Sequence, residues 1–569
     1  QGVDYNMLFS QMKYSRPPVD EILHEYETLQ TKIRTASSAD EALTLFWQYE
    51  KVNESLTTAK TIAEIRNTIN TADEFYEGEK EFFDECTPAL SSKSLDVCRA
   101  LIESPFRDQL EKALSPLLFT KMEQNVKSLS PEILPLMAEE NALVTRYDKL
   151  YASVQIEFDG KLLTLSALAP YKQSPDRAVR KAAYIAEGNW FDAHQDELDE
   201  IYDKLVKNRD AQGRAMGYEN YIPLGFIRMH RIGYSIKDLE AYRAQIIKDV
   251  VPAVCGIKDL QKKRIGISDF MLWDNAFCFK SGNAAPKGTP DEILAAGRKM
   301  YNELAPETAQ FIESMMANEL FDVLSKPGKA QGGYCTYLPG YKMPFIFSNF
   351  NGTSDDVDVL THEAGHAFAA YIAAGKSLPA ILEEPGMESC EIHSMSMEFL
   401  TSDYHQLFFG EDTKKYQLYH AEDALTFLPY GTMVDEFQHI MYAKPSLTPK
   451  ERNEVWKTLE AKYRPWLNMG DVPFYSRGAQ WQRQLHIYEI PFYYIDYCLA
   501  QSVALQFFSA FLQDKTDAWH RYLALVNKAG TESYTELISS AGFASPFKDG
   551  TLSQLTASIY KWISDNQVD

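Results

Sequence analysis

Apolar residues recur at three- and four-residue spacings, with charged residues between them, over most of this chain. The pattern is clearest over residues 20–30, 39–81 and 196–207, and it is typical of amphipathic helices that bury one face. At 569 residues, 45% of them hydrophobic, the chain is long enough to bury a large core. The sequence therefore predicts a mainly α fold.

Two segments interrupt the helical pattern and favour short strands. Over residues 153–165 polar and apolar residues alternate on both sides of Asp159-Gly160, a pair typical of a tight turn, so we expect a β-hairpin. Residues 332–347 are rich in strand-forming side chains on either side of a Leu-Pro-Gly sequence at 338–340. The second segment predicts a small sheet just before the motif described below.

Domain boundaries are weakly marked, because the sequence shows no long low-complexity linker and no internal repeat. We place one boundary where the predicted hairpin ends and a charged helix begins near Asp176. The prediction is an N-terminal helical domain over residues 1–170 that ends in the hairpin, followed by a catalytic domain over residues 171–569.

Charge and cysteine usage exclude several classes of protein. A formal net charge of −23 is unsuited to nonspecific binding of nucleic acid or anionic lipid. We find no uninterrupted apolar segment of about 18 residues, so no membrane span is expected. Seven scattered cysteines without a CxxC pair indicate free thiols in a reducing compartment. We expect a soluble, cytoplasmic protein with neither nucleic acid nor membrane as a partner; its oligomeric state is not predicted.

Residues 362–366 read His-Glu-Ala-Gly-His, a motif with a specific chemical meaning. On a helix, positions four apart differ by about 40° around the axis, so His362 and His366 can bind one cation together. Glu363 is offset by about 100° and lies beside the ion, where it can act as a base on metal-bound water. The motif predicts a zinc site that performs hydrolysis.

A third protein ligand is needed to define the class of zinc enzyme. The extended three-histidine pattern fails, because Ala369 and Ile372 stand at its glycine and histidine positions. A distant carboxylate is the alternative. Three candidates lie near one face of a helix predicted after residue 386: Glu388, Glu391 and Glu398. One of them can bind the metal while another orients a ligand histidine from behind.

Three further segments carry a resemblance to a known family. They are residues 347–357, which lead into the motif, residues 434–439, and residues 486–497, which read His-Ile-Tyr-Glu-Ile-Pro-Phe-Tyr-Tyr-Ile-Asp-Tyr. Over residues 174–563 the chain resembles oligoendopeptidase F, a relative of thimet oligopeptidase and neurolysin. The resemblance implies a two-lobed helical metallopeptidase with a deep central channel, a small β-sheet beside the zinc helix, and one catalytic Zn²⁺.

The resemblance also implies roles for particular residues. Matched position by position, the third zinc ligand falls on Glu391, with Glu388 as the fallback, while Glu398 supports a ligand. Transition-state hydrogen bonding is implied for the segment from His486 onward.

Within that segment we name His486, Tyr494 and Tyr497 as catalytic, together with Glu363 as the base. The segment is one residue shorter than in the thimet oligopeptidase branch, so the choice among Tyr493, Tyr494 and Tyr497 stays open.

The predicted activity is zinc-dependent hydrolysis of internal bonds in short, unstructured peptides, by Glu363-assisted attack of zinc-bound water. One alternative is removal of dipeptides from a free C-terminus, which needs a cation for the terminal carboxylate. Another is a non-catalytic peptide-binding protein, against which the intact Glu363 argues, because metal binding does not require it. Four cations could contact substrate carboxylates, although salt bridges or surface positions are the favoured interpretation: Arg177, Arg180, Lys342 and Arg483.

Overall fold

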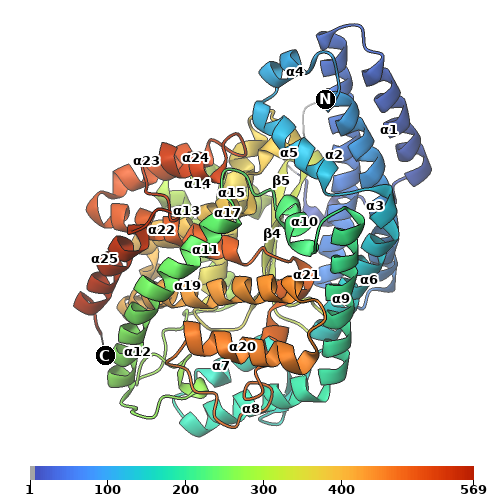
Figure 1. The fold of residues 1–569 in the computed structure, drawn as a ribbon. Helices are drawn as coiled ribbons and strands as arrows, with labels where there is room; N and C mark the ends of the chain where they lie inside the picture. Colours follow the sequence, from blue (N-terminus) through green and yellow to red (C-terminus); the bar gives the residue numbers. More distant parts are fainter. Residues whose placement is uncertain (1–6, 569) are drawn as a thin grey trace.

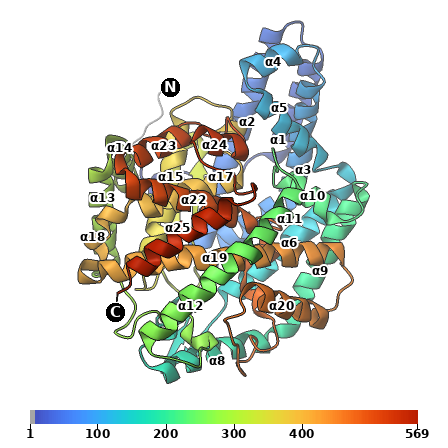
Figure 2. The ribbon, with the colours of Figure 1, turned by 60° about the vertical axis from the view of Figure 1, so that its left-hand side comes forward.

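The computed structural model describes residues 7–568 and is mainly helical, which confirms the predicted fold class (Figure 1). Six helices precede the first strand: α1 (Val19–Arg34), α2 (Ala39–Ile69), α3 (Glu74–Ile102), α4 (Arg107–Ala113), α5 (Pro116–Lys127) and α6 (Leu134–Ala152). Figures 1 and 2 both show α1, α4 and α5 grouped with parts of α2 and α3 at one end of the molecule. Their buried side chains form a separate core with parts of α2 and α3.

The predicted helix over residues 39–81 is wrong in one respect, because the structure divides it into α2 and α3. Helix α2 ends at Ile69, and the Asp73 side chain then accepts hydrogen bonds from the amides of Phe75 and Tyr76. This cap satisfies backbone donors at the start of α3. The apolar periodicity continues across the break because both helices bury a face, so periodicity alone did not reveal the turn.

The remaining helices form the larger part of the molecule. They are α7 (Leu165–Lys172), α8 (Arg177–Ala193), α9 (Gln195–Ala215), α10 (Tyr221–Arg228), α11 (Ile236–Gln245), α12 (Val251–Ile265), α13 (Pro290–Leu304), α14 (Pro306–Ala317), α15 (Asp355–Ala374), α16 (Ala380–Glu383), α17 (Met387–Leu400), α18 (Gln406–Phe409), α19 (Thr413–Ala443), α20 (Pro449–Tyr463), α21 (Leu485–Glu489), α22 (Ile495–Gln513), α23 (Lys515–Val526), α24 (Tyr534–Ser540) and α25 (Thr551–Asp565). The main core also includes side chains of α6 and of the hairpin. The domain boundary at residue 170 therefore stays a prediction.

Both predicted strand regions are present. Strands β1 (Ile156–Phe158) and β2 (Lys161–Leu163) form an antiparallel hairpin whose turn residues, Asp159 and Gly160, both have positive φ. This backbone matches the twist of a two-residue hairpin turn.

The second sheet has three strands in the order β3-β5-β4. The expected pair is β4 (Tyr334–Leu338) and β5 (Met343–Phe350), which run antiparallel. Strand β3 (Phe321–Leu324) pairs in parallel with β5 and was not predicted from the sequence. Because β5 takes the centre, β4 is left at an edge of the sheet.

Helix α22 lies in the middle of the C-terminal core. Its length and apolar composition would allow it to cross a membrane. However, 72% of its most apolar 18-residue stretch is buried inside the protein. It packs along α17 and α19, as Figure 2 also shows. Burial in the core therefore accounts for its apolar sequence.

A buried ion pair fixes the start of α8 to a distant loop. The carboxylate of Asp274 is fully buried, 2.7 Å from Arg177 Nη2 and 2.8 Å from Arg180 Nη2. Burial alone would raise the pKa of Asp274, but the hydrogen bonds from both arginines outweigh it and lower that pKa. Arg483 is likewise paired with the buried Glu187. These three arginines thus have structural partners, as the favoured interpretation predicts.

We predict that Asp274→Asn lowers the free energy of unfolding by about 3 kcal/mol, because it leaves the buried Arg180 without its charge partner. Chemical denaturation of the two proteins measures the difference. Asp269→Asn is the matched control: Asp269 contacts the same Arg177 but its side chain is 71% exposed, so a loss below about 1 kcal/mol is expected. Equal losses in the two variants would contradict this account.

Candidate metal centre

The centre is built where α15 and α17 cross at unusually short range. A Cβ on Gly365 would lie 2.6 Å from Ser394 Cα and 2.7 Å from the His393 carbonyl oxygen. Real Cβ atoms do not approach other atoms so closely, so only glycine fits at this point of the motif. The crossing brings Glu391, one turn before Ser394, against the two motif histidines.

Three donor atoms converge at this crossing. Glu391 Oε2 lies 3.2 Å from His362 Nε2 and 3.3 Å from His366 Nε2, and the donors of all three residues lie within 4.8 Å of one another. Tetrahedral zinc with bonds of about 2.0–2.1 Å separates its ligand atoms by about 3.3 Å. The spacing and the nitrogen and oxygen donor set therefore fit zinc.

Glu398 supports the first histidine from behind. Its Oε1 lies 2.7 Å from His362 Nδ1, and its Oε2 lies 2.7 Å from His420 Nε2 on α19. A carboxylate that accepts the Nδ1 proton leaves the Nε2 lone pair of His362 facing the centre. Sequence reasoning missed His420, because a single histidine in a long helix carries no local signal of its partner.

Glu388, the fallback ligand, lies away from the triangle. Its Oε2 is 3.6 Å from Arg231 Nη1. Arg231 is 7% exposed, forms a close ion pair with Asp496, and donates to the Phe492 carbonyl oxygen at 2.7 Å. This network joins α17 to the start of α22. Glu388 therefore connects these helices, and Glu391 is the glutamate whose carboxylate contacts the two motif histidines.

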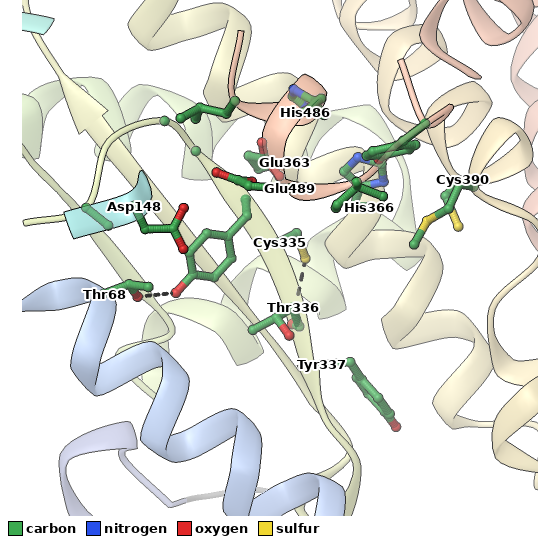
Figure 3. A pocket seen from close by; sticks show the side chains of 18 of the residues that line it. Thr68, Asp148, Cys335, Thr336, Tyr337, Glu363, His366, Cys390, His486 and Glu489 are labelled. Carbon is green, nitrogen blue, oxygen red and sulfur yellow. Dashed lines mark hydrogen bonds between the residues drawn. The ribbon is translucent and has the colours of Figure 1, made fainter. Parts of the chain in front are cut away.

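The three donors line a cavity of about 460 Å³. Figure 3 shows Glu363, His366 and His486 around one part of it, with Cys335, Thr336 and Tyr337 of β4 along another. Glu363 is 7% exposed, and burial raises the pKa of its carboxyl group. A basic group beside a metal, at the wall of a cavity, is placed to move protons.

The segment from His486 to Tyr497 reaches the same cavity. The hydroxyl of Tyr493 donates to Glu391 Oε1, and Tyr497 Oη lies 3.1 Å from His486 Nε2. His486, Tyr493 and Tyr497 line the cavity. Burial lowers the pKa of His486 to about 4, so its imidazole is neutral near pH 7.

Tyr494, named from the sequence as catalytic, packs against His486 and Tyr497, with ring centroids 5.1 and 5.3 Å apart. It is 9% exposed, is not part of the cavity lining, and packs against Phe427 and Tyr430 of α19. Tyr494 already has helical backbone angles and its ring contacts that of Tyr497, as a shared helical face predicts, but its side chain does not reach the cavity. The structure brings Tyr493 to the metal ligands in its place.

Comparison with known families agrees with this geometry. The model of peptidase family M3 matches residues 170–293 and 299–556, and the M3 N-terminal domain model matches residues 9–129. The chain belongs to peptidase family M3. Members of this family are metallopeptidases that act on oligopeptides, so the predicted enzyme class and family resemblance are confirmed.

Individual M3 relatives cover most of the chain. A solved structure of PZ peptidase A with an inhibitor is 43% identical, covers 99% of each chain, and superposes with a TM-score of 0.97. Oligopeptidase PepF of Bacillus subtilis is 23% identical, over 90% of this chain and 78% of that protein. An oligoendopeptidase F homologue of Lactococcus lactis subsp. lactis is 21% identical, over 75% and 70% respectively.

We predict that Gly365→Ala in this M3 peptidase weakens zinc binding at least about tenfold, because the added methyl group pushes α15 from α17 and separates the donors. A chelator-competition titration of the metal-free protein measures the affinity. Gly375→Ala at the end of the same helix is the control, since a Cβ there meets nothing closer than 3.5 Å. Unchanged affinity in Gly365→Ala would disprove the role of the close crossing.

Proposed function

We propose that this M3 peptidase is a zinc-dependent endopeptidase that hydrolyses internal bonds of short, unstructured oligopeptides. The observation that carries the proposal is the convergence of His362, His366 and Glu391 beside Glu363, on the wall of one cavity. Zinc held by these residues would supply a Lewis acid and would lower the pKa of a water molecule.

Glu363 is the general base in this proposal. Its carboxylate takes a proton from the attacking water and later returns it to the departing amine, so no covalent bond to the protein forms. Because Glu363 follows His362 on α15, the same helix that holds the metal also fixes the base. Metal binding needs only the ligands, whereas proton transfer needs Glu363.

His486 and Tyr497 are proposed as donors to the oxyanion that forms on the attacked carbonyl. Both line the cavity, and both are neutral near pH 7, because burial lowers the pKa of His486 and raises that of Tyr497. Donors fixed in place before the reaction stabilise developing charge without reorganisation. Tyr493 has a different part, since its hydroxyl holds Glu391.

Strand β4 supports the substrate assignment. It is an edge strand whose residues line the cavity, so its free backbone groups can pair with an extended peptide. A Cβ on Gly333, just before β4, would lie 3.3 Å from the Phe347 carbonyl oxygen and 3.6 Å from Glu363 Oε1, so the chain passes close to the base. A cavity of about 460 Å³ admits a peptide segment and excludes a folded domain.

The cavity favours internal cleavage over removal of C-terminal dipeptides. Its described lining includes two lysines, and each has an acidic partner: Lys80 Nζ is 2.9 Å from Asp84, and Lys149 Nζ is 2.7 Å from Glu77. Neither is left to bind a terminal carboxylate. Peptides blocked at both ends should therefore be cleaved, and a requirement for a free C-terminus would contradict the proposal.

We also propose a reducing, cytoplasmic location. All seven cysteines are free thiols, as expected where disulfides do not persist. Cell fractionation with an antibody checks this proposal, and recovery of the protein outside the cytoplasm would contradict it.

Glu363→Gln is expected to keep its zinc and to lose cleavage of end-blocked, internally quenched peptides by at least about 10³-fold, because the amide cannot accept a proton. Metal analysis and a fluorescence assay on the same sample measure both properties. Cleavage at the wild-type rate by the zinc-loaded variant would refute Glu363 as the base.

Glu391→Gln and Glu388→Gln form a matched pair of variants. They distinguish a residue that binds the metal from a residue that only stabilises the surrounding structure. We expect the first to weaken zinc binding at least about 100-fold, because a ligand charge is lost. The second should bind zinc within about tenfold of wild type and unfold more easily, because Arg231 loses a charge partner. Isothermal titration and thermal unfolding distinguish them, and the reverse order of zinc affinities would exchange the two roles.

A further inference from the structure

A series of hydrogen bonds runs from a tyrosine outside the cavity to a tyrosine in its lining. Its members are Tyr430, Gln484, His486 and Tyr497. The first two do not line the cavity, and neither has a role in the chemistry described so far. Their position behind His486 nevertheless decides where the imidazole carries its proton.

The direction of the series is set at the Tyr430 end. The Tyr430 hydroxyl donates to Gln484 Oε1 at 2.8 Å, which turns the amide nitrogen of Gln484 toward His486. An amide nitrogen can only donate, and Gln484 Nε2 lies 2.9 Å from His486 Nδ1, so Nδ1 is the acceptor.

The same reasoning fixes the other side of the imidazole. A neutral histidine carries one ring proton, so an accepting Nδ1 places that proton on Nε2. His486 Nε2 lies 3.1 Å from Tyr497 Oη and can donate to it, which leaves the Tyr497 proton available to the cavity. Each donor in the series thus points toward the cavity.

We propose that Gln484, oriented by Tyr430, is a positioning residue that holds His486 in the tautomer with its proton on Nε2. The inference rests on the proposed function, in which the pair of His486 and Tyr497 donates to the oxyanion. In the opposite tautomer the Nε2 lone pair would accept the Tyr497 proton, and the cavity would lose that donor at the point where negative charge develops.

Two substitutions of Gln484 change the hydrogen bond in different ways. Gln484→Met keeps the length of the side chain and removes the donor, so both tautomers become populated. Gln484→Glu places a carboxylate beside Nδ1, which accepts a proton there and imposes the opposite tautomer. We expect kcat to fall about tenfold in the first and about 100-fold in the second, with KM within about threefold of wild type.

Nuclear magnetic resonance of histidine-labelled, metal-free protein reads the tautomer without any activity. The ring nitrogens of His486 are assigned by the signals lost in His486→Gln. We expect a proton on Nε2 in wild type, a mixture in Gln484→Met and in Tyr430→Phe, and a proton on Nδ1 in Gln484→Glu. Gln109→Met, at an exposed position of α4, is the control and should change neither the signals nor kcat.

A proton on Nδ1 of His486 in the wild-type protein would overturn the proposal, and this result does not depend on the folding of any variant. Unchanged kcat in Gln484→Glu would also overturn it. Failure of the proposed function is distinguishable, because it would show as full cleavage activity in Glu363→Gln while the His486 tautomer stayed as expected.

Discussion

The contact between α15 and α17 at Gly365 is the constraint on which the site depends. The absence of a side chain at this position lets the two helices approach until the Glu391 carboxylate reaches both motif histidines. Three donors on two rigid helices are positioned before any ligand binds, which reduces the cost of organising a metal site. If the two helices lay farther apart, the Glu391 carboxylate would not reach the two motif histidines, and the three donors would not converge.

Further contacts hold this arrangement from outside. Glu398 orients His362, and the Arg231 network ties α17 to the start of α22, so the metal helix and the tyrosine segment are fixed to each other. A buried arginine between two carboxylates is costly to disrupt, because removing one partner leaves a desolvated charge. The proposed chemistry thus depends on α15, on α17 and on the segment around α21, and the contacts described above fix these elements to one another.

Local patterns in the sequence predicted much of this structure. The helix of the His-Glu-Ala-Gly-His motif, the hairpin at Asp159-Gly160 and the pair β4 and β5 all follow from the spacing of residues near one another in the chain. Family resemblance pointed to Glu391 where spacing alone left Glu388 and Glu398 equally open. What could not be predicted depends on distant partners: β3 pairs only through β5, and His420 matters only through Glu398. The difference between Tyr493 and Tyr494 likewise depends on a distant partner, because Tyr493 donates to Glu391 and lines the cavity whereas Tyr494 does not line it.

The central claim is that two histidines and one glutamate, with no thiol, hold one zinc ion. X-ray absorption at the zinc edge of protein loaded with one equivalent of metal tests it most directly. The account predicts two imidazole ligands and oxygen or nitrogen scatterers alone, at about 2.0–2.2 Å. A sulfur scatterer at about 2.3 Å, from Cys335 or Cys390 in the cavity lining, or an imidazole count other than two, would contradict it.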